Sequence, residues 1–231
     1  MQGINAEIRE KVNIREVYRY LGYGTKQPDC AVEKLICEVL DELMESIKPK
    51  HIYKLYICDV SPTEVTLRTE DNMSSFLVFE SRNLAANLMQ CDQVALVAAT
   101  LGLEADKLLQ KYEVLNMAKA SIAQACGAAC IEVYCNIIQE RIRSRLSEHG
   151  RERYLRPRFS PGYGDLPLQN QKAIFAALEC TKRIGLTLTD SLLMYPTKSV
   201  TAFIGLTANS QSCHIEKCKN CDNIGCEFRN E

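Results

Sequence analysis

The sequence has no excess of charge of either sign and no long uninterrupted run of apolar residues. Its 28 lysines and arginines are balanced by 29 aspartates and glutamates, for a formal net charge of -1. This balance argues against a nucleic-acid surface, which needs clustered positive charge. The longest apolar segment, Val94 to Leu103, is shorter than the ~20 residues that span a bilayer. The first residues have no signal-peptide core. We therefore expect a soluble, cytoplasmic protein that binds neither nucleic acid nor membrane.

Several common catalytic signatures are also missing. We find no serine–histidine–aspartate pattern, no P-loop and no dinucleotide-binding glycine fingerprint. The glycine-rich loop after a first strand, typical of methyltransferases that act on small molecules, is absent too. The sequence therefore disfavours hydrolases of the serine class, P-loop nucleotide enzymes and a conventional small-molecule methyltransferase.

What is present is the hydrophobic pattern of an α+β domain. Apolar residues recur at helical spacing over 29–47, 103–113 and 116–147, and a further helix is predicted over 168–178. Residues 51–60, 64–69 and 75–79 read as strands joined by short turns, which favours an antiparallel meander. Ser81 is placed to cap a helix that ends near residue 90. Further strands are expected over 93–100 and 199–206. We predict one α+β domain over residues 1–206 and a short tail over 207–231.

Twelve cysteines divide into two groups. Eight are scattered between Cys30 and Cys180. They lie mostly within apolar patterns, where cysteine behaves as a small buried hydrophobe; examples are Cys37, Cys58, Cys126, Cys130 and Cys135. The remaining four, Cys213, Cys218, Cys221 and Cys226, crowd into the tail with the spacing C-x4-C-x2-C-x4-C.

Four thiolates so close in sequence can surround one metal centre. An iron–sulfur cluster is favoured by the x4/x2 spacing, and zinc is the alternative, because zinc ribbons usually carry two separated C-x2-C pairs. Two other interpretations of this spacing are four unrelated cysteines and disulfide-bonded cysteines, although disulfides are disfavoured in the cytoplasm.

The segment from Arg156 to Asp165 is the most informative stretch in the middle of the chain. Its prolines and glycines restrict the backbone path, while Arg158 and Tyr163 project from it. A rigid loop with an arginine can bind a carboxylate, and a tyrosine face can receive a cation or a nucleobase. The segment could equally be a structural loop that crosses the core.

Three segments in order resemble the activation domain of cobalamin-dependent methionine synthase. The first is the helical stretch from Glu132 to Arg143, which ends in Glu-Arg-Ile-Arg. Next comes Arg-x-x-Pro-Gly-Tyr, here Arg158 to Tyr163, and then Met-x-Pro-x-x-Ser-Val, here Met194 to Val200. The resemblance covers roughly residues 116–206, and the first third of the chain matches poorly.

The resemblance implies a bent antiparallel sheet with long helices and a groove for S-adenosylmethionine. In that family, the loop arginine and tyrosine, here Arg158 and Tyr163, hold the ligand opposite a helix glutamate, here Glu132. The backbone of Ser160, Pro161 and Gly162 would bond its adenine or its amino-acid end. Two departures stand out. The family's acidic residue near the N-terminus has no clear match, with Asp29 and Asp59 as weak choices, and its tyrosine-bearing segment is replaced by residues 207–213.

The function implied is reactivation of methionine synthase by reductive methylation of cob(II)alamin, with S-adenosylmethionine as methyl donor. The chain would be a stand-alone reactivation subunit without a general acid or base. Its partners would be a cobalamin-binding methionine synthase, or a related corrinoid protein, and an electron donor such as a flavodoxin or ferredoxin; the tail cluster could relay the electron. The alternative is an iron–sulfur or zinc interaction module that docks on a corrinoid protein without using S-adenosylmethionine.

Overall fold

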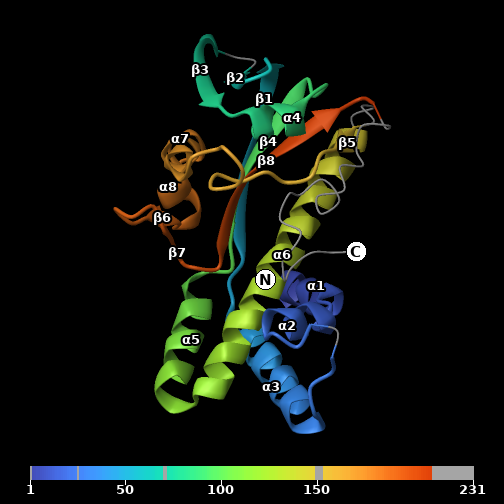
Figure 1. The fold of residues 1–231 in the computed structure, drawn as a ribbon, viewed down its shortest axis with the longest axis vertical. Helices are drawn as coiled ribbons and strands as arrows, with labels where there is room; N and C mark the ends of the chain where they lie inside the picture. The colour runs from blue at the N-terminus through green and yellow to red at the C-terminus, as the bar shows by residue number, and fades with distance from the viewer. Residues whose placement is uncertain (1, 25, 70–71, 149–152, 210–231) are drawn as a thin grey trace.

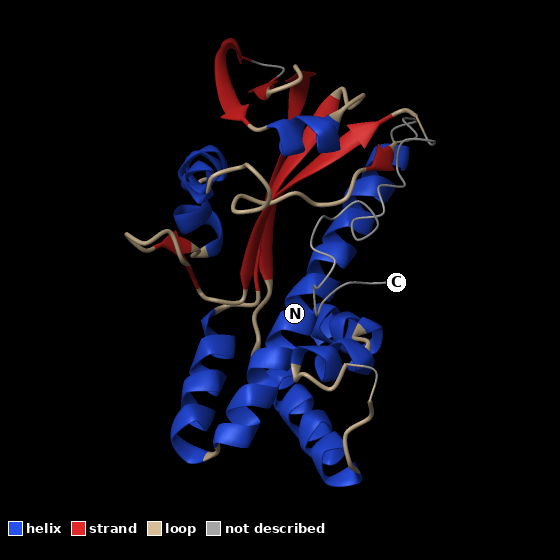
Figure 2. Cartoon of the chain, viewed as in Figure 1, coloured by secondary structure: helices blue, strands red, loops and turns tan. Residues whose placement is uncertain are grey.

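A computed structural model describes residues 2–24, 26–69, 72–148 and 153–209. Within them, a curled antiparallel sheet lies between helices (Figures 1 and 2). The helices are α1 (Gln2–Lys11), α2 (Ile14–Tyr20), α3 (Cys30–Ser46), α4 (Arg82–Leu88), α5 (Leu103–Leu115), α6 (Met117–Glu148), α7 (Gln171–Leu178) and α8 (Cys180–Ile184), with a 3-10 turn at Leu168–Asn170. The strands are β1 (Lys50–Val60), β2 (Glu64–Thr69), β3 (Asn72–Glu80), β4 (Gln93–Thr100), β5 (Tyr154–Leu155), β6 (Thr187–Leu188), β7 (Met194–Tyr195) and β8 (Ser199–Thr207).

The main sheet has the order β3-β2-β1-β4-β8-β5, and all its pairings are antiparallel. The predicted meander is confirmed as β1-β2-β3. Strand β4 is central, since it pairs with β1 from Gln93↔Ile57 to Thr100↔Lys50 and with β8 on its other side. The predicted α+β class is therefore confirmed, as is the bent antiparallel sheet.

Both faces of β4 are covered, which explains its unbroken apolar run. Ala95, Val97 and Ala99 pack in one core with α1, α2, α3, α5 and α6. The alternate residues Val94 and Leu96 pack in a second core with α4, α7 and α8. Figure 1 shows α6 along one side of the sheet and α7 and α8 on the other.

Local signals account for most boundaries. Asp29 caps α3, since its carboxylate accepts the N–H groups of Ala31 and Val32 at 2.9 Å each. Ser81 caps α4 in the same way, accepting the Leu84 N–H at 3.0 Å. The helices α1, α2 and α8 were not predicted. They are short, and α1 and α2 are held by packing against α6.

Helix α6 is the spine of the domain. Within the part of the chain that the structure describes, it is the one helix long and apolar enough to cross a membrane by length and composition. The helix has no long uninterrupted apolar run, so the sequence pattern alone did not single it out. Its apolar residues have another explanation, because 67% of its most apolar 18-residue window is buried. The helix packs against α1, α2, α3 and α5 among others.

Candidate functional site

The loop that carries Arg158 leaves β5 and runs beside β8. The Arg156 N–H donates to the Gly205 carbonyl at 2.8 Å, and Phe159 forms a two-way bridge with Phe203 at 3.0 and 2.8 Å. Arg156 itself is buried, and its guanidinium donates to the Met89 carbonyl just after α4 at 2.7 Å. The chain is thus fixed to the sheet immediately on both sides of Arg158.

Beyond Phe159 the chain folds into a compact turn. The Gly162 N–H donates to the Leu166 carbonyl at 2.9 Å, and the Tyr163 N–H donates to the Ser160 carbonyl at 3.2 Å. Gly162 and Gly164 have φ of 93° and 55°, which favours glycine at both positions. Pro161 is buried and Ser160 half-buried. Of the backbone donors expected at residues 160–162, the Gly162 N–H is therefore already used inside the turn.

Arg158 crosses from this loop to α6. Its guanidinium donates to the Glu132 carboxylate at 2.6 Å, to the Asn136 side-chain oxygen at 2.8 Å and to the Gln139 side chain. These three acceptors lie at i, i+4 and i+7 along one face of the helix. The Arg158 side chain is 15% exposed and that of Glu132 52%. The ion pair therefore opens to solvent on its acidic side.

Tyr163 lies at the tip of the turn and is 68% exposed. It has a second tyrosine nearby that sequence reasoning missed, namely Tyr20 at the end of α2. Helix α2, which carries Tyr20, packs against α6. The pKa of Tyr20 is raised by burial and further by the charge of Glu132, against the opposing charge of Arg19, with smaller effects of Glu16 and Tyr163. The Arg19 guanidinium lies 5.1 Å from the Tyr20 ring centroid. The sequence offers one local signal for the helix that carries Tyr20, namely Asn13, which caps the seven-residue helix α2.

A cavity of about 310 Å³ adjoins Arg158 on the side toward β5. It shares Asn136 and Gln139 with the arginine, and the full lining is Asn136, Gln139, Glu140, Arg143, Tyr154 and Leu155. The lining is mixed, with two amides, one acid–arginine pair, one phenol and one apolar side chain. The cavity thus lies between α6 and β5, and two of its lining side chains also accept hydrogen bonds from Arg158.

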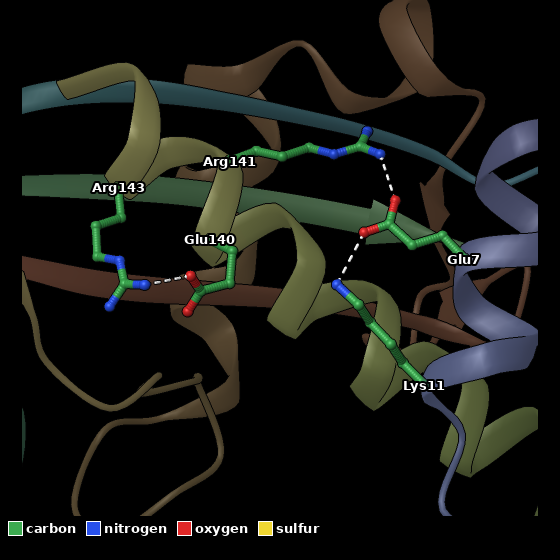
Figure 3. Close-up of polar contacts among 5 residues, drawn as sticks. All are labelled: Glu7, Lys11, Glu140, Arg141 and Arg143. Carbon is green, nitrogen blue, oxygen red and sulfur yellow. Dashed lines mark hydrogen bonds and ion pairs between the residues drawn. The ribbon is translucent and has the colours of Figure 1, made fainter. Parts of the chain in front are cut away.

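Glu140, Arg141 and Arg143 have structural partners (Figure 3). Arg141 donates to Glu7 of α1 at 2.8 Å, and Lys11 donates to the same carboxylate at 2.9 Å. The pKa of Glu7 is lowered, first by Lys11 and then by Arg141, against the opposing effect of burial. Arg143 pairs with Glu140 at 2.6 Å. Arg141 therefore ties α1 to the helix that carries Glu132.

The segment from Met194 to Val200 guides β8 into the sheet. It contains a cis peptide bond before Pro196. Buried Asp106 on α5 accepts the Thr197 N–H at 3.1 and 3.2 Å and also the Thr197 hydroxyl. The Lys198 side chain lies over Gly127 of α6, so close that a Cβ there would be 2.8 Å from its Cε. This motif therefore positions β8 against α5 and α6.

The cysteines of the domain behave mostly as expected. Cys58, Cys126, Cys130 and Cys135 are buried, and burial raises the pKa of the Cys126 thiol to about 12. The prediction for Cys37 was wrong, because its side chain lies on the exposed face of α3. Among the residues with described structure, no group of three or more His, Cys, Asp or Glu side chains could hold a metal. The predicted metal ligands Cys213, Cys218, Cys221 and Cys226 lie outside the described residues.

The two acids named as weak choices for the N-terminal contact have other roles. Asp29 caps α3, as described above, and Asp59 pairs with Arg68 of β2 at 2.8 Å. Neither lies on the loop or on α6. Among the residues of the N-terminal helices, Tyr20 has its pKa raised first by burial and then by the charge of Glu132.

Comparison with known proteins identifies the fold and the family. No curated protein matches the chain. The solved structure of the MetH reactivation domain bound to AdoHcy is similar in fold, with a TM-score of 0.65 and 16% identity over 90% of this chain and 77% of that one. Residues 80–224 match the family described as vitamin B12 dependent methionine synthase, activation domain. This match spans more than half of the chain, so the chain belongs to the family of methionine synthase activation domains.

Proposed function

We propose that this chain binds S-adenosylmethionine between the Arg158 loop and α6 and presents its methyl group for the reactivation of cobalamin-dependent methionine synthase. The observation that carries the proposal is the contact of Arg158 with Glu132. Both residues had been named for this role, although they lie 26 positions apart in the chain. The AdoHcy bound by the structurally similar domain supports the same ligand class.

The site offers charges that complement the amino-acid end of the ligand. That end carries a carboxylate, which suits the planar donors of Arg158, and an ammonium, which suits the carboxylate of Glu132. In the free protein the two side chains satisfy each other. Because the Glu132 side chain is 52% exposed, ligand groups can reach the ion pair from solvent. The ion pair would thus keep the Arg158 guanidinium and the Glu132 carboxylate in place while leaving them accessible to the ligand.

The rest of the ligand would lie against the turn. Tyr163 and Tyr20 present aromatic faces that favour a sulfonium or a nucleobase. Ser160 and Pro161 supply carbonyl oxygens, and Gly162 permits close approach of the ligand to the backbone. No general acid or base is needed, because the methyl group leaves sulfur without proton transfer. The electron pair of the broken carbon–sulfur bond stays on sulfur, and the product is S-adenosylhomocysteine.

The remaining parts of the reaction would come from partners. Cobalamin, carried by the methionine synthase or a related corrinoid protein, supplies the nucleophile that accepts the methyl group after one-electron reduction. A flavodoxin or ferredoxin would deliver the electron. We further propose that residues 207–231 form a separate metal-binding tail, with Cys213, Cys218, Cys221 and Cys226 around an iron–sulfur cluster or zinc.

Isothermal titration calorimetry with S-adenosylmethionine tests the binding site. We expect the wild type to bind and Arg158→Ala to bind at least about tenfold more weakly, equal to about 1.4 kcal/mol. Arg153→Ala is a matched control: Arg153 is also 15% exposed and pairs with one carboxylate, that of Asp92 at 2.8 Å, which directly precedes β4. It should bind like the wild type. A folded wild-type protein that does not bind would favour the alternative, a docking module that does not use the methyl donor.

Two further measurements test the cobalamin partner and the metal-binding tail. Methyl-labelled S-adenosylmethionine, reductant and oxidised cobalamin-loaded methionine synthase should give labelled cobalamin only when this chain is present. Anaerobic purification with iron, sulfide and zinc analysis decides the nature of the tail. Substituting both Cys218 and Cys221 by serine should remove the metal, and a metal content unchanged by this double substitution would refute the tail site.

A further inference from the structure

Asp165 joins the ligand-binding turn to a different part of the domain. Its carboxylate accepts the Arg82 N–H at 2.8 Å and the Asn83 N–H at 3.1 Å, both at the start of α4. It also accepts the hydroxyl of Ser81. In return, the Asn83 side-chain oxygen accepts the Asp165 N–H at 3.0 Å. Four hydrogen bonds therefore fasten one residue of the turn to one end of α4.

This set of bonds leaves no room for a side chain at the preceding position. A Cβ on Gly164 would lie 2.4 Å from the Asn83 side-chain oxygen and 2.8 Å from its Cγ. Gly164 also has a φ of 55°, where other residues are strained. The turn and α4 are thus fitted to each other. The hydroxyl of Ser81 serves both sides, because it also accepts the Leu84 N–H.

The charge of Asp165 is part of the contact. The pKa of its carboxyl is lowered, chiefly by the hydrogen bond from Ser81 and also by the backbone N–H groups of Asn83 and Arg82, against the effect of burial. Every described hydrogen bond of the Asp165 carboxylate is one that the carboxylate accepts. An amide at this position would keep one acceptor oxygen but would turn an NH2 group toward an N–H donor.

The turn is consequently held at both ends. Arg158 attaches one end to α6, and Asp165 attaches the other end to α4. Between the two anchors, Tyr163 remains 68% exposed. We propose that Asp165 is a positioning residue, which holds the turn from Ser160 to Gly164 in its ligand-binding shape before the ligand arrives. This inference rests on the proposed binding of S-adenosylmethionine.

The expected effect follows from preorganisation. A turn that is loose in the free protein must be ordered by the ligand, at an entropic cost that lowers affinity. We expect Asp165→Ala to weaken S-adenosylmethionine binding about tenfold to hundredfold, with a more unfavourable binding entropy. Asp165→Asn, which keeps one acceptor, should lose less. The unfolding midpoint should fall only modestly, because the variant loses three hydrogen bonds to an exposed carboxylate but leaves both cores intact.

Hydrogen exchange on the free protein and calorimetry with S-adenosylmethionine test this together. In Asp165→Ala, the N–H groups of Gly162, Tyr163 and Leu166 should exchange faster, and saturating ligand should restore their protection. Asp59→Asn is the control, since Asp59 is an exposed carboxylate whose described ion pair is with Arg68 of β2. Should Asp165→Ala fail to fold, Asn83→Ala removes only the return bond and gives the same readouts.

The outcomes separate the two proposals. If the wild type does not bind, the proposed function fails, while the exchange data still show whether Asp165 holds the turn. If the wild type binds and Asp165→Ala binds equally well, the positioning role is wrong. Weaker binding with unchanged exchange at the turn would also overturn it, because the loss would then have another cause.

Discussion

Gly205 of β8 lies where three elements meet, and its replacement by alanine is expected to destabilise the domain. A Cβ at this position would lie 2.6 Å from the Cys91 sulfur, 2.8 Å from a Leu88 methyl carbon and 3.0 Å from Arg156 Cγ. Carbon atoms in contact prefer about 3.5–4.0 Å. All three neighbours are buried, so none can move into solvent. The added methyl group must therefore displace packed atoms.

The magnitude follows from comparable overpacked cores. Inserting one carbon into a close-packed site costs about 1–3 kcal/mol. Alanine recovers part of this, about 0.5–1 kcal/mol, because glycine loses more backbone entropy on folding. We expect a net loss of about 0.5–2 kcal/mol. For a chain of this size, that corresponds to a fall in Tm of about 2–4 °C per kcal/mol.

Urea unfolding and calorimetry measure this loss. The urea midpoint of Gly205→Ala should fall with an unchanged slope, since the surface exposed on unfolding is the same. Gly3→Ala is the control, because no atom lies within 4 Å of its Cβ position. That variant should be as stable as the wild type or slightly more so. If Gly205→Ala unfolds at the wild-type midpoint, β8 does not pack against α4 and Arg156 as described.

Three other predictions concern the site and its support. Tyr20→Ala should weaken S-adenosylmethionine binding by about 0.5–1 kcal/mol in calorimetry, since it removes an aromatic face beside Glu132. Burial, and then the charge of Arg141, lowers the pKa of His51 below its usual 6.5, so protonation favours the unfolded chain. Stability should fall as acid is added below that value, and urea unfolding at about pH 7.5 and about pH 5.5 should show a smaller difference for His51→Gln. Asp106→Ala removes the buried acceptor of Thr197 and should lower the unfolding free energy by about 1–3 kcal/mol in thermal unfolding.

The sequence by itself determined the strong local elements. Strand β2 occurs at the residues predicted, 64–69, and β4 at 93–100. Helix α3 begins at Cys30, one residue after the predicted start, and Asp29 caps it. These elements carry their own signals, a regular apolar period and a capping side chain, which act over a few residues. The sequence also predicted the loop around Arg158, because its prolines and glycines constrain the backbone locally.

What only the tertiary structure decided is which distant residues meet. Helices α1 and α2 are too short to be stable alone, and α6 supplies the surface that holds them. For that reason Tyr20 could not be placed beside Glu132 from the sequence. The attachment of Asp165 to α4 joins positions about 80 residues apart. Such contacts depend on how whole helices and strands pack, and no local sequence pattern shows which distant residues will meet.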